Sequence, residues 1–103
     1  YNNSRVVKLA KDGTWVKTVG THGSGPNQFN TVHGIAVDAQ QGLVYVADRG
    51  NNRIQVYDTD LNFKKTITGI GMPWTVQVTS KYIYSGDGTG KLYAHATTTC
   101  IVV

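Results

Sequence analysis

The chain has 103 residues, a net charge of +4 and 40% hydrophobic residues, so it can form a folded core and is not a disordered segment. It contains 13 Val, 13 Thr, six Tyr and 12 Gly but only four Leu, one Met and no Glu, which favours strands and excludes an all-helical bundle, a coiled coil or a Rossmann-type α/β domain. Because the basic residues are scattered and the longest apolar run is Leu43–Ala47, neither nucleic acid nor a membrane is an expected partner.

An internal repeat organises the chain. Residues 3–15 align with residues 51–63 at an offset of 48, with Asn, Arg, a β-branched residue, Asp and an aromatic residue in matching places. A second alignment pairs residues 32–38 with 73–79, at an offset of 41. A period near 40 residues that is built only of strands is typical of the blades of a β-propeller.

In chain order, the sequence predicts the last two strands of one blade in residues 1–20, a complete blade in 21–69 and a following blade in 70–103. The final strand is placed at 99–103. The strands predicted for the complete blade are residues 34–38, 43–47, 53–58 and 63–67, joined by turns at Gln41–Gly42, Asp48–Asn52 and Asp58–Asn62.

The predicted fold is therefore all-β, with about two and a half blades of four antiparallel strands. An immunoglobulin-like sandwich is the alternative, but it does not explain why the same residues recur in register. The first strand of each blade is expected to be innermost. Eight side chains are expected to be buried between sheets: Ile35, Val37, Val44, Val46, Ile54, Val56, Val76 and Val78.

Two and a half blades cannot close a ring, so we expect further polypeptide at both ends of the chain. It is supplied either by missing blades of the same parent or by identical chains in a ring or a filament. Cys100, the single cysteine, cannot form an internal disulfide and is either a buried apolar residue or paired with another chain. Asn2 begins a glycosylation sequon, and Thr97–Thr99 is a second possible glycosylation site.

Residues 44–57, Val-Tyr-Val-Ala-Asp-Arg-Gly-Asn-Asn-Arg-Ile-Gln-Val-Tyr, resemble the core of an NHL repeat, a type of propeller blade. A narrower resemblance is to the peptidyl-α-hydroxyglycine α-amidating lyases and their bacterial relatives. It rests on Asn-Ser-Arg-Val-Val-Lys at 3–8, Gly-Ser-Gly-Pro-Asn-Gln-Phe-Asn at 23–30, Val-His-Gly-Ile-Ala-Val-Asp at 32–38, Ala-Asp-Arg at 47–49 and Pro-Trp-Thr-Val at 73–76.

The lyase resemblance implies a six-bladed ring in an extracellular or periplasmic protein, with zinc on its axis. The reaction implied is cleavage of a peptidyl-hydroxyglycine into a peptide amide and glyoxylate. By resemblance, Arg5 binds the substrate carboxylate and His33 is one of three histidine ligands of zinc. Trp74 stands at the position equivalent to His33 in the next blade, and no residue matches the catalytic tyrosine.

The residues also allow a different interpretation. His33 taken alone is a hydrogen-bonded structural residue, because zinc needs three or four ligands. Arg5 and Arg53 hold the same repeat position, which indicates a structural use of this arginine, such as bracing the turn after residue 47 against Asp48. Two classes of function follow: part of a zinc-dependent lyase, which this chain alone does not complete, or a non-catalytic propeller module for protein interaction or self-assembly, with a peptide as a possible ligand.

Overall fold

The computed structural model of the protein describes residues 4–88, 92–95 and 100–102, which form strands and one short 3-10 helix, η1 (Arg49–Asn51). The strands assemble into antiparallel sheets and one short parallel pair. The predicted all-β fold of antiparallel propeller blades is therefore confirmed. Asn2 and Thr97–Thr99 lie outside the described residues, as do the surroundings of the Cys100 side chain. No helix in the described ranges is long and apolar enough to cross a membrane.

The central sheet is a complete four-stranded blade in the order β5-β6-β7-β8. Its strands are β5 (Val32–Asp38), β6 (Leu43–Asp48), β7 (Arg53–Asp58) and β8 (Phe63–Ile67). β5 starts two residues before its prediction and β6 ends one residue after it, whereas β7 and β8 match. The sequence predicts these strands well because each turn carries residues that favour turns; in the last one the Asp58 carboxylate accepts hydrogen bonds from the backbone N–H groups of Asp60 and Asn62, both 2.9 Å long.

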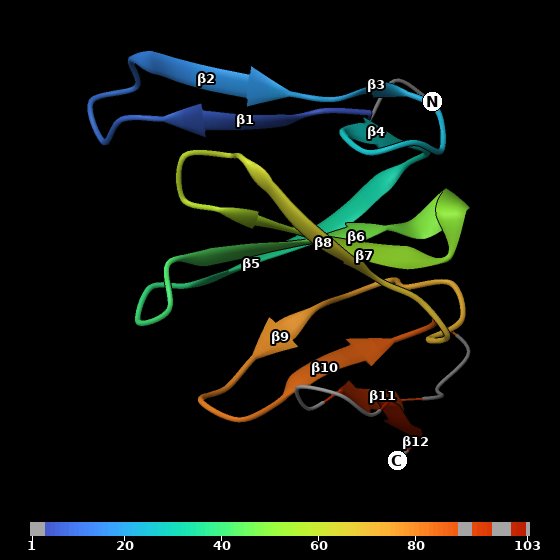
Figure 1. Cartoon of the computed structure of the whole chain (residues 1–103). Helices are drawn as coiled ribbons and strands as arrows, with labels where there is room; N and C mark the ends of the chain where they lie inside the picture. Colours follow the sequence, from blue (N-terminus) through green and yellow to red (C-terminus); the bar gives the residue numbers. More distant parts are fainter. Residues whose placement is uncertain (1–3, 89–91, 96–99, 103) are drawn as a thin grey trace.

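The other sheets lie on either side of this blade (Figure 1). On one side is a hairpin of β1 (Val6–Leu9) and β2 (Trp15–Val19), joined to the blade through the short parallel pair β3 (Thr21–His22) and β4 (Gln28–Phe29), which the sequence did not predict. On the other side is a second four-stranded sheet that contains β9 (Gln77–Val78), β10 (Ile83–Gly86), β11 (Leu92–His95) and β12 (Cys100–Val102).

The core consists of two clusters, one on each face of the central blade. On one face Val44, Val46 and Tyr57 pack against the hairpin and the loop that follows it, through Val6 and Phe29. The opposite face, together with the residues of the next sheet that cover it, forms the second cluster: Tyr45, Ala47, Ile54, Val56, Ile67, Ile70, Val76 and Ile83. β6 is apolar on both faces because a sheet covers each of them.

For two of the eight residues predicted to be buried, the prediction is wrong: Ile35 and Val37 are 52% and 61% exposed. Both lie in β5 opposite Val46 and Val44, on the face that packs against the β1–β2 hairpin. Among the described residues, the cluster on this face includes Val32 at the start of β5 but neither Ile35 nor Val37, so these two side chains stay uncovered. Val78 is partly buried, and the other five predicted core residues are buried.

A buried ion pair attaches the loop of residues 23–30 to the central blade. The Asp48 side chain is fully buried, and one of its oxygens lies 2.8 Å from Arg53 Nε. The other two Arg53 nitrogens donate hydrogen bonds of 2.8 Å to the backbone carbonyls of Ser24, Gly25 and Gln28. The predicted bracing of the turn at residues 48–52, by the pairing of Arg53 with Asp48, is thus confirmed. The same guanidinium also holds the loop of residues 23–30.

The neighbouring motif residues bind the same loop. Asn51 Nδ2 donates to the Gly23 carbonyl at 2.7 Å and to Asp48 at 2.9 Å, and Gln55 Nε2 donates to the Gln28 carbonyl at 2.6 Å. The buried Tyr57 hydroxyl donates to Gln55 Oε1 at 3.1 Å. Burial of the phenol raises the pKa of Tyr57 to about 12. We call Asp48, Asn51, Arg53 and Gln55 the loop brace.

Val46 is buried whereas Val37 is exposed, so truncating these two side chains to alanine should destabilise this chain by different amounts. Val46→Ala should lower the free energy of unfolding by about 2 kcal/mol, because it leaves a cavity between two sheets. Val37→Ala should change it by less than about 0.5 kcal/mol, because the side chain already contacts solvent. Urea unfolding followed by circular dichroism measures both. Equal costs would mean that other polypeptide covers β5 in solution.

The loop brace predicts that Arg53→Met is strongly destabilising, since the Arg53 side chain is only 12% exposed and pairs with a buried carboxylate. The substitution leaves the Asp48 carboxylate buried without a cation and frees three backbone carbonyls, so we expect a loss of about 3 kcal/mol in the free energy of unfolding. Lys64→Met is the matched control, since its ammonium group lies 4.0 Å from Asp58 at the surface and should contribute less than about 0.5 kcal/mol. A loss in R53M no larger than that in K64M would contradict the bracing role.

Tyr57 predicts a loss of stability in alkali. Its pKa is raised from 10.0 to about 12 in the folded chain, so the unfolded state releases this proton first as the pH rises. The contribution is intact below pH 10, and between pH 10 and pH 12 the free energy of unfolding should fall by about 2 to 3 kcal/mol from this group. Tyr57→Phe should lose this part of the pH dependence, as measured by urea unfolding at a series of pH values.

Candidate functional site

His33 is aimed by a bulge in β5. Val32 pairs with Asp48 and Gly34 pairs with Ala47, so His33 has no partner on β6. A bulge of this kind redirects a side chain, and the His33 imidazole is exposed with its Nδ1 2.7 Å from the Trp74 carbonyl oxygen. Because a carbonyl only accepts hydrogen bonds, Nδ1 carries the proton, which leaves the Nε2 lone pair of the neutral ring available.

The Trp74 ring contacts two other side chains, those of His33 and Arg49. Its ring centroid is 4.1 Å from that of His33, and the Arg49 guanidinium carbon is 4.6 Å from the Trp74 ring centroid. The backbone N–H of Trp74 donates to the Gly86 carbonyl at 2.7 Å, and a Cβ at Gly88 would lie only 3.0 Å from the Trp74 ring. Gly88, at φ +83°, therefore leaves room for the indole, which remains 40% exposed.

We call His33, Arg49 and Trp74 the Trp74 cluster. Arg49 is held by η1, since its backbone N–H donates to the Thr31 carbonyl at 3.0 Å and Asn52, in the left-handed conformation, ends the helix. The Arg49 Nε atom is buried and has no hydrogen-bond partner among the described residues. The cluster thus offers an unpaired guanidinium donor, an imidazole lone pair and the exposed part of an indole ring.

The structure does not bring the two residues predicted from the lyase resemblance together. Arg5 precedes β1 and is exposed, with its guanidinium 5.9 Å from the Trp15 ring. No contact joins Arg5 to His33 within the described chain. Arg53, at the equivalent repeat position, is fully engaged in the loop brace. The carboxylate-binding role of Arg5 and the metal-binding role of His33 stay predictions.

The described residues supply one ligand toward a zinc site and do not complete one. They contain no group of three or more His, Cys, Asp or Glu side chains placed to hold a metal. His33 is suited to act as a single ligand because its Nε2 makes no hydrogen bond to a described residue, but Trp74 stands at the equivalent position of the next blade, where the lyase resemblance would place a second imidazole. Zinc binding would need at least two further ligands from other polypeptide.

Arg49 and the loop residues bonded to Arg53 were not predicted as functional or structural sites. Arg49 directly follows Asp48 in the motif, so the Ala-Asp-Arg sequence could have indicated Arg49 as a candidate site residue. Its stacking on Trp74, 25 positions further along the chain, could not be read from spacing, because the contact joins two different blades.

Part of this chain is similar to the NHL repeat and to several known proteins. A sequence profile of the NHL repeat matches residues 29–57. Mouse NHL repeat-containing protein 3 is 48% identical over 58 residues, which cover 56% of this chain and 16% of that protein. Protein lin-41 of Caenorhabditis elegans is 50% identical over 48 residues, 47% of this chain and 4% of the relative. Rat peptidylglycine alpha-amidating monooxygenase is 39% identical over 64 residues, 58% of this chain and 7% of the relative.

The matched segment spans less than a fifth of each of these relatives. The NHL profile match over residues 29–57 contains the brace residues around Asp48, and the four-stranded central sheet is the blade in which they lie. Residues 29–57 therefore match the NHL repeat, and the β-propeller blades of this chain are similar over part of their length to NHL repeat-containing protein 3 and to the amidating enzymes.

Proposed function

We propose that this chain forms part of the ligand-binding end of an NHL propeller and that the Trp74 cluster binds a carboxylate group of a peptide. The observation that carries the proposal is the half-buried Arg49 guanidinium, which lies 4.6 Å from the Trp74 ring centroid and forms no ion pair with a described residue. A guanidinium without an anionic partner matches both the charge and the geometry of a carboxylate. The exposed part of the Trp74 ring supplies apolar contact area beside it.

The first reading of this site is a non-catalytic binding module. It is supported by the loop brace, because the polar residues of the repeat are occupied by internal hydrogen bonds and are not free for chemistry. Binding then rests on the cluster beside the motif. In this reading the protein binds a peptide and releases it unchanged.

The second reading is a zinc-dependent amidating lyase that releases a peptide amide and glyoxylate from a peptidyl-hydroxyglycine. It is supported by the 39% identity to rat peptidylglycine alpha-amidating monooxygenase and by the free Nε2 of His33. His33 would be one zinc ligand, and the metal would act as a Lewis acid. Arg5 would hold the substrate carboxylate. An extracellular or periplasmic location belongs to this reading.

Both readings need further polypeptide beside this chain. The exposed Ile35 and Val37 on β5 lie where a complete preceding blade would cover them, and the β1–β2 hairpin has two strands where the central blade has four. Blades of the same parent, or identical chains in a ring or a filament, would bury this face. In this chain, a cost of V37A equal to that of V46A would support cover by identical chains, whereas a small cost of V37A would favour cover by blades of the same parent.

The binding proposal is tested with two peptides of one sequence, one with a free C-terminal carboxylate and one with a C-terminal amide. The protein should prefer the carboxylate, and Arg49→Met should remove that preference with about a tenfold loss of affinity. Isothermal titration calorimetry measures both affinities. Arg5→Met is the matched control: a loss in R5M, with R49M unaffected, would transfer the carboxylate role to Arg5.

Two further measurements separate the readings, and they use the propeller completed by the polypeptide that supplies the other zinc ligands. In that protein the lyase reading expects bound zinc by metal analysis and glyoxylate release from a peptidyl-hydroxyglycine, both lost in His33→Ala. The binding-module reading expects the peptide preference without glyoxylate release. No preference for the carboxylate peptide and no glyoxylate would contradict both readings.

A further inference from the structure

A second candidate site lies between the central blade and the following sheet, away from the Trp74 cluster. It is a cleft of about 410 Å³, within the size range of small-molecule sites. The central blade contributes residues at the end of β5, the start of β6 and β8, and the next sheet contributes the turn between β9 and β10. Its lining residues are Asp38, Gln41, Leu43, Tyr45, Lys65, Val78, Thr79, Ser80, Lys81, Tyr82 and Ile83.

The cleft and the Trp74 cluster are at opposite ends of β5. His33 lies near the start of this strand and Asp38 at its end, and five residues of strand span roughly 17 Å. None of the cluster residues lines the cleft. A ligand in the cleft would therefore be separate from the peptide proposed for the cluster.

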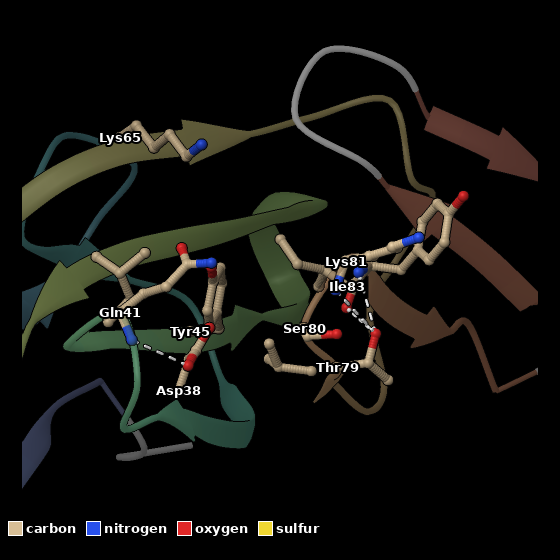
Figure 2. Close-up of a pocket in the computed structure, with 11 residues that line it drawn as sticks. Asp38, Gln41, Tyr45, Lys65, Thr79, Ser80, Lys81 and Ile83 are labelled. Atoms are coloured by element: carbon tan, nitrogen blue, oxygen red, sulfur yellow. Dashed lines mark hydrogen bonds between the residues drawn. The ribbon is translucent and has the colours of Figure 1, made fainter.

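Several polar groups of the cleft are unpaired within the described chain. Tyr45 is 5% exposed, yet its hydroxyl makes no hydrogen bond to a described residue. The ammonium groups of Lys65 and Lys81 form no ion pair or hydrogen bond there either. Figure 2 shows Tyr45 on one wall with Asp38 and Gln41, and Lys81 on the other with Thr79 and Ser80. Unpaired donors that converge on one cleft favour a ligand rich in acceptors.

The charges of the cleft favour an anion that also carries a hydrogen-bond donor. The lining residues carry two ammonium groups, those of Lys65 and Lys81, and one carboxylate, that of Asp38. The Asp38 carboxylate accepts a hydrogen bond from the Gln41 backbone N–H at 3.2 Å. An anionic group would lie near the lysines and the Tyr45 hydroxyl, and a hydroxyl of the same ligand would donate to Asp38. Leu43, Val78 and Ile83 provide the apolar part of the walls.

We propose that this cleft binds a small hydroxylated organic anion, a phosphate ester or a carboxylate, through Lys65, Lys81 and the Tyr45 hydroxyl. Glucose 6-phosphate and gluconate are the probes for the two kinds of anion, and glucose is the neutral control. Isothermal titration calorimetry on the full chain should give saturable one-to-one binding of at least one anion and none of glucose. The anion that binds more tightly identifies the preferred charged group.

The variants test the assignment. Lys65→Met or Lys81→Met should each weaken binding about three- to fivefold, as expected for exposed charge contacts, and Tyr45→Phe should weaken it without changing the fold. Lys64→Met is the matched control, because Lys64 neighbours Lys65 on β8 and does not line the cleft. Arg49→Met should bind the anion normally, so that a failure here is distinguishable from a failure of the proposed peptide site.

No saturable binding of either anion at millimolar concentration would overturn the proposal. Equal binding of glucose would also overturn it, because the lysines would then have no role. The same holds if K64M weakens binding as much as K65M and K81M, since the effect would then come from the overall positive charge.

Discussion

The buried Asp48 carboxylate is the group on which the arrangement of the blades depends. A buried carboxylate is stable only when donors surround it, and here Arg53, Asn51 and the backbone N–H of Asn30 all donate to it. Two of these donors lie in the turn and strand that follow Asp48, and one lies in the loop that precedes the blade. One carboxylate therefore joins the loop, the turn and β7, and Arg53 extends the connection to three loop carbonyls.

This fixed loop positions the preceding hairpin. Phe29, in the short strand that leaves the loop, is fully buried and lies in the same cluster as Val6 of β1 and Tyr57 of β7. Its ring is 6.2 Å from that of Tyr57, whose hydroxyl donates to the brace residue Gln55. Polar bracing and apolar packing thus act on neighbouring residues, and the loss of one would loosen the other because they share the loop of residues 23–30.

The brace also explains where ligand chemistry can occur. The side chains that make the repeat recognisable are used inside the blade, so the unpaired polar groups of the two candidate sites come from other positions. One such group is Arg49, which follows the buried Asp48 and leaves the blade to stack on Trp74 of the next sheet. Others are Lys65, in the middle of β8, and Lys81, in the turn between β9 and β10, which both line the cleft between the same two sheets. Both candidate sites are therefore formed between blades, where neighbouring repeats bring together residues that differ from one repeat to the next.

The sequence by itself determined the strands of the central blade, their turns and the apolar nature of β6 on both faces, because strand periodicity and turn chemistry are local. It also indicated the pairing of Arg53 with Asp48, because a residue at a repeat position has the same local neighbours in each blade. Only the tertiary structure decided that Ile35 and Val37 are exposed, since alternation marks a face as apolar but cannot tell whether another sheet covers it. Likewise, the contacts of Arg49 and His33 with the Trp74 ring depend on how one blade packs on the next, which local spacing does not encode.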